Sequence, residues 1–247
     1  MRRDHRVAAV LLGTAVLVLA AGAAAQDFQK SYPLEQGGVI KIRNVSGNVT
    51  VTGYGGAEVV VLGYKEGRDR DRVEIEDLSA PGRVEVRVRY PEFGNTDAGV
   101  NFEVRVPQEV SFNFEGISSV SGNVEIRRVS GKIRAEAVSG NVTIADVTGS
   151  VSASAVSGNV DVHIVRLEGG RDMKFSAVSG NVSVRAPADL DAYVEMSTIS
   201  GSLKTDFPLE VIERRYGPGR SARGRLGSGA CRIRISSVSG RVSLTKN

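Results

Sequence analysis

One five-residue sequence, Val-Ser-Gly-Asn-Val, returns along this chain at a fixed interval. Its exact and loose copies are centred on seven corner glycines: Gly47, Gly122, Gly140, Gly158, Gly180, Gly201 and Gly240. Weaker corners at Gly131 and Gly149 lie halfway between, so glycine recurs every 9 residues in this region. Only the stronger corners carry Asn after Gly, which makes the true period 18 residues with two corners in each turn. A fixed period of this length is typical of a solenoid.

The residues between corners alternate apolar and polar, as in Val142-Thr143-Ile144, which is the pattern of a strand with one buried face. Ser-Gly then bends the chain, and we expect positive φ at glycines such as Gly140, because glycine has no Cβ to clash. Stacked coils would bury the apolar faces by pairing each strand in parallel with its copy about 4.8 Å away. The sequence therefore predicts an all-β solenoid, with an antiparallel β-sandwich as the alternative. Asparagines that fall in adjacent coils are expected to form a side-chain ladder: Asn48, Asn123, Asn141, Asn159 and Asn181.

Residues 1–25 have the features of a secretory signal peptide. Three arginines precede an apolar run from Val7 to Ala20, and Ala23-Ala24-Ala25 provides the small residues of a cleavage site. We expect residues 26–247 to form a single domain without a transmembrane segment. The leader predicts an exported protein that is periplasmic, at the cell surface or secreted.

The leader, the sequence Gly-Gly-Val-Ile-Lys-Ile-Arg-Asn-Val-Ser-Gly-Asn-Val-Thr-Val at residues 37–51 and the repeated Val-Ser-Gly-Asn-Val together resemble a bacterial family of envelope proteins named "putative adhesins". The resemblance extends from about Val39 to Leu244. It implies a single-stranded right-handed parallel β-helix, here with coils of about 18–22 residues, and an extracytoplasmic location. The family provides no catalytic motif, and its name rests on likeness of fold, which does not fix function.

Little in the sequence indicates catalysis, a metal or a cofactor. Cys231 is the only cysteine, and His163 is the only histidine after the leader; we expect His163 to be an exposed surface residue. These two residues are too few for a metal site built from histidine and cysteine. The corners also lack the repeated aspartates of calcium-binding β-rolls. The enzyme alternative is a polysaccharide lyase or hydrolase on a β-helix, which would need a suitable acidic pair.

The interval between Gly201 and Gly240 departs from the repeat, and we interpret about 206–230 as an Arg/Gly-rich insertion. Its candidate anion-binding residues are Arg214, Arg215, Arg220, Arg223 and Arg225. Arginine suits carboxylate and phosphate groups because it binds them bidentately; a solvated loop that only aids solubility is the alternative. The sequence favours a non-catalytic, exported envelope interaction module or adhesin-like scaffold. Its partner would be an anionic envelope polymer or another protein rather than nucleic acid, and the oligomeric state is left open.

Overall fold

The computed structural model describes residues 26–168, 172–213 and 219–247, and the expected leader at 1–25 lies outside them. The described residues form an all-β fold with one short 3-10 helix, η1 (Arg70–Arg72). In chain order the strands are β1 (Phe28–Tyr32), β2 (Val39–Ser46), β3 (Val49–Tyr54), β4 (Val59–Glu66), β5 (Glu74–Asp77), β6 (Arg83–Arg89), β7 (Gly99–Pro107), β8 (Ser111–Ser121), β9 (Val124–Arg127), β10 (Ser130–Ser139), β11 (Val142–Ser157), β12 (Val160–Arg166), β13 (Met173–Ser179), β14 (Val182–Ala186), β15 (Ala192–Ser200), β16 (Leu203–Thr205), β17 (Glu210–Glu213), β18 (Arg220–Leu226), β19 (Cys231–Ser239) and β20 (Val242–Lys246). No helix among the described residues is long and apolar enough to cross a membrane.

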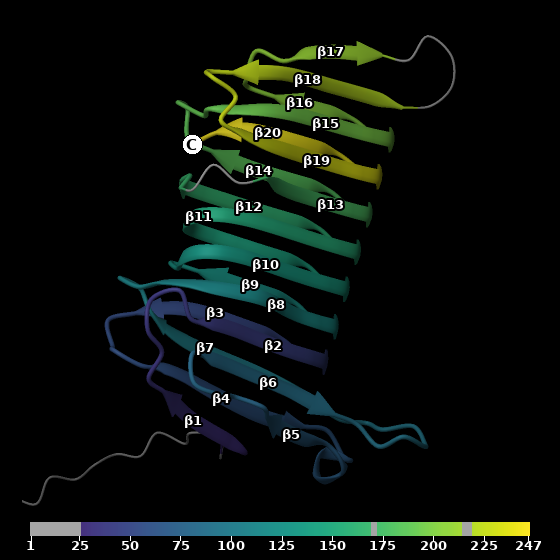
Figure 1. Cartoon of the computed structure of the whole chain (residues 1–247). Helices are drawn as coiled ribbons and strands as arrows, with labels where there is room; N and C mark the ends of the chain where they lie inside the picture. Colours follow the sequence, from purple (N-terminus) through teal and green to yellow (C-terminus); the bar gives the residue numbers. More distant parts are fainter. Residues whose placement is uncertain (1–25, 169–171, 214–218) are drawn as a thin grey trace, which may run out of the picture.

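A typical coil consists of a longer strand, a Ser-Gly corner and a shorter strand that returns on the other side; β6 and β7 form a coil without this corner, and β7 is the longer of the two. The longer strands stack in the order β6, β2, β8, β10, the second half of β11, β13, β19 and β15, and we call this stack the first layer. The shorter strands stack in the order β7, β3, β9, the first half of β11, β12, β14, β20 and β16, which is the second layer. All of these pairs are parallel, so the predicted solenoid-like stacking is confirmed and the antiparallel sandwich is wrong for the repeat region (Figure 1).

The order of the coils in the stack differs from their order in the chain. The coil of β2 and β3 lies between β6/β7 and β8/β9, although it precedes all four strands in sequence. At the other end, the last coil of the chain, β19 and β20, lies between β13/β14 and β15/β16. Figure 1 shows this exchange as yellow C-terminal strands between green ones, and as purple N-terminal strands above teal ones. At the first end the chain adds later coils on both sides of β2 and β3, and at the other end it inserts its last coil between two earlier ones.

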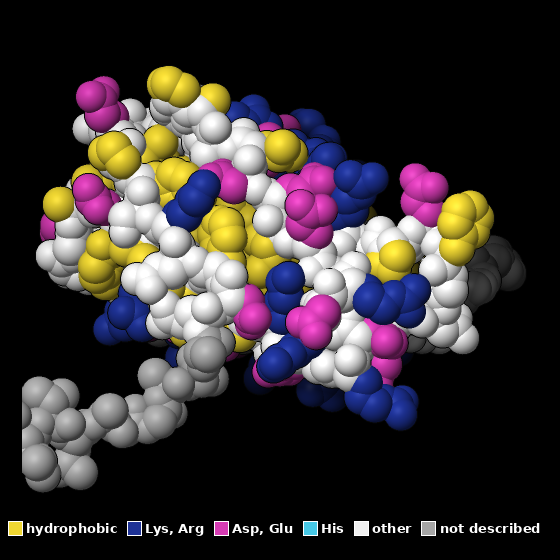
Figure 2. All heavy atoms as spheres, turned by 90° about the horizontal axis from the view of Figure 1, so that it is seen from below, with side chains coloured by type: hydrophobic (Ala, Val, Ile, Leu, Met, Phe, Trp, Pro, Cys, Tyr) yellow, Lys and Arg dark blue, Asp and Glu magenta, His cyan; other side chains and the backbone are white. Residues whose placement is uncertain are grey.

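Antiparallel strands close both ends. At one end β4 pairs with β7 and β1 pairs with β4, while β5 pairs with β6. At the other end β18 pairs with β15 and β17 pairs with β18. Figure 2, which looks at the end that carries β1 and β5, shows hydrophobic side chains in its middle and charged ones around them.

Strands β17 and β18 lie within the expected Arg/Gly-rich insertion. The alternation of the repeat is therefore not lost there: Ala222 and Leu226 are buried, and the residues between them are more exposed. The alternative of a solvated loop is wrong for residues 220–226, which form β18. A strand rich in arginine and glycine is possible here because arginine can occupy the exposed side while the small Ala222 occupies the buried side.

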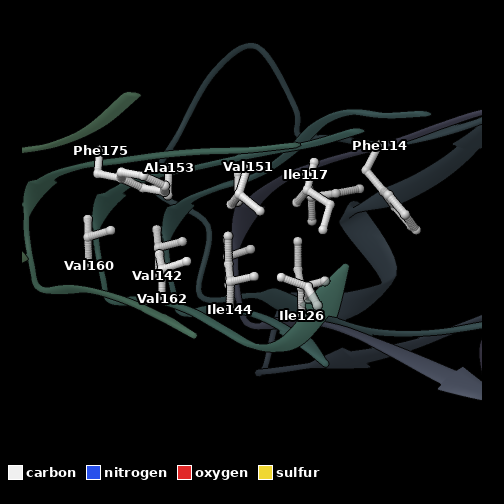
Figure 3. Close-up of a cluster of buried hydrophobic side chains, with 14 of the residues drawn as sticks. Phe114, Ile117, Ile126, Val142, Ile144, Val151, Ala153, Val160, Val162 and Phe175 are labelled. Carbon is white, nitrogen blue, oxygen red and sulfur yellow. The ribbon is translucent and has the colours of Figure 1, made fainter. Parts of the chain in front are cut away.

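The core lies between the two layers. Figure 3 shows Ile117, Val151 and Phe175 of the first layer facing Ile144 and Val160 of the second. Each of these side chains is no more than 1 % exposed. Since full burial of such a side chain contributes about 1.5–3 kcal/mol, the repeated inward column is the main source of stability.

Close backbone approach, rather than one shared φ, explains the glycine at every corner. Positive φ occurs at four of the seven corner glycines: Gly47, Gly122, Gly180 and Gly240. Gly140, Gly158 and Gly201 do not share it, so the expected positive φ at Gly140 is wrong. A Cβ atom at Gly158 would lie 2.0 Å from the carbonyl oxygen of Gly140, which no real Cβ tolerates. The coils pack so closely at the corner that only glycine fits.

The corner asparagines form the expected ladder, with a side-chain-to-backbone bond at each step. The backbone N–H of Asn159 donates to Oδ1 of Asn141 at 2.9 Å, and that of Asn141 donates to Oδ1 of Asn123 at 2.9 Å. The ladder runs through Asn101, Asn48, Asn123, Asn141, Asn159, Asn181 and Arg241, the last contributing its backbone N–H. Asparagine is suited to the position because its side-chain oxygen reaches one coil along the stack.

Candidate functional site

His163 lies beside a carboxylate, and Cys231 is buried. His163 lies on β12 with Nδ1 2.8 Å from Oδ1 of Asp146, and its side chain is 24 % exposed, so the expected freely exposed histidine is wrong. Cys231 is buried at the start of β19, and burial raises the pKa of its thiol. A buried neutral thiol is a poor nucleophile. The described ranges also contain no group of three or more His, Cys, Asp or Glu residues that could hold a metal ion.

The five arginines predicted to bind anions fall into two groups. Arg214 and Arg215 lie outside the described residues. Arg220, Arg223 and Arg225 lie on β18, in the antiparallel part of the sheet rather than in a loop.

Acidic residues flank the middle of these arginines. Arg223 is in register with Glu195 of β15 on one side and with Glu210 of β17 on the other. Glu195 also accepts a hydrogen bond from Nε of Arg234 at 3.1 Å. Carboxylates this close offset the positive charge that an anionic ligand would meet on β18.

A second group of cations, which the sequence did not single out, lies on the outward face of the first layer. Three adjoining hollows share Arg134, and the largest has a volume of about 400 Å³. We call the region the basic trough and define it by five residues: Lys41 and Arg43 of β2, Lys132 and Arg134 of β10, and Lys174 of β13.

Two features of the strands hollow the trough. In β8, Gly116 adopts a φ of 84° and the register with β10 shifts at this point, which is a β-bulge. On the next coil, β11 presents only Ser152 and Ser154 between the long side chains of Arg134 and Lys174. Short residues between long ones leave a groove on an otherwise flat sheet face.

Most of the cations in the trough have no ionic partner. Nζ of Lys41 lies 3.5 Å from Oε1 of Glu85. The other four members make no ion pair with any residue in the described ranges. Five cationic and three acidic side chains line the hollows, the acidic ones being Glu115, Glu136 and Asp172, of which Glu115 is in register with Arg134. The trough therefore carries a surplus of positive charge on ordered strands.

On the neighbouring β6, in contrast, arginines form ion pairs with carboxylates. Arg83 Nη2 lies 2.6 Å from Oε2 of Glu85, and Arg87 Nε donates to Oε2 of Glu76 at 2.5 Å. Partners of this kind hold the pKa of each carboxyl below its ordinary value: burial would raise the pKa of Glu85, but Arg83 and Lys41 outweigh it, and Arg87 lowers that of Glu76. The unpaired members of the basic trough are thus a departure from the local pattern.

The chain matches a protein-family model, and two solved structures match it at low similarity. The model of the family described as "Toastrack DUF4097" matches residues 33–245. A "putative cell adhesion protein" from Clostridium sporogenes is 12 % identical with a TM-score of 0.38, covering 89 % of this chain and 99 % of that one. A "putative adhesin" from Bacteroides fragilis is 14 % identical with a TM-score of 0.37, covering 89 % of this chain and 96 % of that one.

Identities and TM-scores this low carry no information about what this chain binds. A search of the curated proteins finds no match to the chain. The family model, in contrast, spans nearly all of the described residues, from before the first corner to the last strand. The chain belongs to the Toastrack DUF4097 family.

Proposed function

We propose that this protein is an exported, non-catalytic interaction module of the cell envelope, and that it binds an acidic polymer through the basic trough. The observation that carries the proposal is the group of unpaired cations, Arg43, Lys132, Arg134 and Lys174, on ordered strands around one groove. The leader-like residues 1–25 support export. The alternative, a carbohydrate-active enzyme on the same fold, predicts instead that sugar products are released from the bound polymer.

The chemistry of the trough favours carboxylate or phosphate groups. The guanidinium groups of Arg43 and Arg134 can hold such groups bidentately, whereas Lys132 and Lys174 act as point charges. The serines on β11 add hydroxyl groups that can donate to or accept from sugar or phosphate oxygens. A polymer that presents anionic and hydroxyl groups together therefore fits the lining.

The positions of the cations also favour a long ligand over a small one. The basic strands β2, β10 and β13 alternate with β8 and β11, so they repeat at about twice the strand spacing, or about 10 Å. A single small anion would contact one of these strands. A chain with recurring anionic groups would contact all three, and its binding would gain from their effective concentration.

Ordered strands reduce the cost of binding. Arg43, Lys132 and Arg134 have partners in register on both sides within the first layer, and Lys41 and Lys174 have one on one side, so binding orders only side chains. Arginines on a flexible segment would have to lose backbone freedom as well, at about 1–2 kcal/mol for each residue.

We also propose that the coils wind right-handed, as about 98 % of crossovers between parallel strands do; an experimental structure with left-handed coils would contradict this.

A matched pair of variants tests the proposed site. The first carries Arg43→Gln, Lys132→Gln and Arg134→Gln in the basic trough, and the control carries Arg220→Gln, Arg223→Gln and Arg225→Gln on β18. Both remove three positive charges from exposed strand positions. Binding to immobilised acidic glycans and to anionic vesicles is measured at low and at physiological salt.

We expect the trough variant to lose at least about tenfold in affinity and the β18 variant to lose little, since long-range attraction falls equally in both. Wild-type binding should weaken as salt rises, because exposed charges are screened over about 8–10 Å. Equal losses in the two variants would show that only net charge matters, and a larger loss in the β18 variant would favour the arginines of that segment. Release of reducing sugar from the bound glycan would contradict the non-catalytic role.

A further inference from the structure

Exposed aliphatic side chains form a continuous line along one edge of the stack. Eleven large hydrophobic residues are exposed among the described residues, and seven of them occupy the same place, immediately before the Ser-Gly corner. We call these seven the aliphatic ridge: Val45, Val120, Val138, Val156, Val178, Val238 and Ile199, in stack order. Each is between 41 % and 54 % exposed.

The register of the strands makes the ridge continuous. Ser139 pairs with Ser157 and Ser157 pairs with Ser179, so the preceding valines are neighbours at the strand spacing. The same register holds from the Ser46 corner to the Ser200 corner. Seven coils at about 4.8 Å give a ridge about 34 Å long.

The fold itself does not require aliphatic residues at these positions. Two residues earlier, on the same outward side of the first layer, the chain carries Ser118, Glu136 and Ser154. These polar residues lie on the same paired strands as the ridge residues. The fold therefore accepts a polar residue on this face. Strand propensity alone therefore leaves the repeated valine unexplained, whereas a contact that excludes water would account for it.

The corner side of the ridge is almost free of charge. In the seven four-residue segments that begin with the ridge residues, Ser, Gly and Asn make up the rest, and Arg241 is the one charged residue. The whole chain, in contrast, is 24 % charged. A partner could cover this strip without removing water from fixed charges, which would otherwise cost several kcal/mol for each ion.

We propose that the aliphatic ridge is a self-association surface, on which a second copy of this chain packs in the antiparallel direction. A second ridge has the same repeat along the stack, so its side chains meet those of the first over the whole length. A two-fold axis through the central coil pairs Val156 with Val156 of the second copy and pairs Val45 with Ile199. Such an interface is isologous and closed, which makes a dimer rather than a fibre.

The size of the surface indicates a weak dimer. With the flanking serine and asparagine columns, the strip is about 17 Å wide, so the two copies together would bury about 1,100 Å², at the lower limit for specific interfaces. We therefore expect association that depends on concentration, from monomer at low micromolar to dimer towards millimolar protein. The cations of the basic trough precede the ridge on the same strands, Arg43 two residues before Val45 and Arg134 four residues before Val138, so they lie on the opposite side of the ridge from the serine and asparagine columns.

Sedimentation equilibrium of three proteins tests the proposal. The Val156→Glu variant would place two like charges opposite each other at the axis, and we expect it to stay monomeric at every concentration. Val165→Glu is the matched control, because Val165 is 50 % exposed but lies outside the ridge; it should associate like the wild-type protein. Unchanged circular dichroism and thermal midpoints would confirm that both variants are folded.

Spin-label distances test the arrangement of the copies. Labels are attached at Ser157→Cys or at Ser200→Cys, with buried Cys231 replaced by Ala. In the antiparallel dimer the labels at the central coil should be close, and those at the terminal coil should lie about 29 Å apart along the ridge, six strand spacings. Short distances at both positions would overturn the antiparallel arrangement.

Three results would overturn self-association itself. These are a wild-type protein that is monomeric up to millimolar concentration, a dimer that Val156→Glu leaves intact, and a dimer that Val165→Glu abolishes equally. A monomeric wild-type protein whose binding to neutral phosphatidylcholine vesicles is lost in Val156→Glu would assign the ridge to a lipid surface instead.

Discussion

The carbonyl oxygen of Gly122 lies 2.1 Å from the position that a Cβ atom would occupy on Gly140. The two residues are one coil apart, and the next pair repeats the contact, with 2.0 Å between the carbonyl oxygen of Gly140 and a Cβ on Gly158. The atom in the way belongs to the backbone of Gly122, whose N–H donates a hydrogen bond to the carbonyl oxygen of Ser139, so it cannot move without disturbing that bond. Each corner glycine is therefore required by the coil beside it.

Replacing Gly140 by Ala should destabilise the protein through this contact. We expect a loss of about 1–3 kcal/mol in the free energy of unfolding, the range for overpacking a close contact. Gly55→Ala is the control, because no atom lies within 4 Å of the position of its Cβ and its φ is not in the positive region. Denaturant titration of both variants provides the measurement. Similar losses in the two would mean that glycine at Gly140 is not needed for the stacking.

A buried column next to the corners offers a stabilising change. Ser119 Oγ donates to the carbonyl oxygen of Gly47 at 2.8 Å, and Ser237 Oγ donates to that of Gly180 at 2.8 Å. In the middle coils alanine occupies the same place, as at Ala155, and no hydrogen bond within the described ranges reaches the carbonyl oxygen of Gly140. Ala155→Ser should supply this bond.

We expect Ala155→Ser to raise the free energy of unfolding by about 0.5–1.5 kcal/mol, the net value of a typical hydrogen bond. The reciprocal change, Ser119→Ala, should lower it by a similar amount. Thermal melting of the two variants checks both signs. A destabilising Ala155→Ser would show that the middle coils have no room for the hydroxyl group.

The asparagine ladder predicts different outcomes for two substitutions of one residue. Asn141→Ala removes the acceptor for the backbone N–H of Asn159 and should cost about 0.5–1.5 kcal/mol. Asn141→Asp keeps an oxygen at the same place and should cost less at neutral pH. The difference is measured by urea titration of the two variants. If Ala is no worse than Asp, the ladder contributes nothing measurable at this exposed edge.

The repeat in the sequence predicts the coil, but it does not predict the order in which coils stack. Alternation and Ser-Gly corners are local signals, and every copy carries nearly the same ones. Which copies become neighbours depends on long-range pairing, such as Ser179 with Ser239 rather than with Ser200. The long intervals between Gly47 and Gly122 and between Gly201 and Gly240 are the traces of these exchanges in the sequence.

The sequence did not predict the basic trough for the same reason. Lys41 and Arg43 resemble ordinary solvated positions of one strand, and Lys132 and Arg134 resemble those of another. They come together because β8 alone separates β2 from β10 in the stack. Aligning the outward residues in stack order rather than chain order would have revealed the cluster. The arginines near Arg220 were more visible because they are close in sequence, yet their acidic neighbours are also supplied by other strands.

The carboxyl group of Asp77 lies near the end of the stack that carries β1. We expect its ionisation to make the stability of the protein depend on pH in the acid range. Burial would raise the pKa of Asp77, but hydrogen bonds from Lys30 and Ser79 outweigh it and hold the pKa at about 2, below its ordinary 3.8. Lys30 Nζ donates to Oδ2 at 2.7 Å and Ser79 N donates to Oδ1 at 3.0 Å. The interaction joins β1 to β5, two strands that do not pair directly.

Because the pKa is lower in the folded state, the unfolded chain binds more protons between about pH 4 and pH 2. The stability that Asp77 contributes should thus be fully present above about pH 4 and be lost as the pH falls through 2. Asp77→Asn should be less stable than wild type at neutral pH, and the gap between the two should narrow below about pH 4. Urea titrations of both proteins at several pH values measure this gap, and other carboxyl groups cancel in the comparison. A gap that stays constant from neutral pH down to pH 2 would show that Asp77 is not ionised against Lys30 in the folded protein.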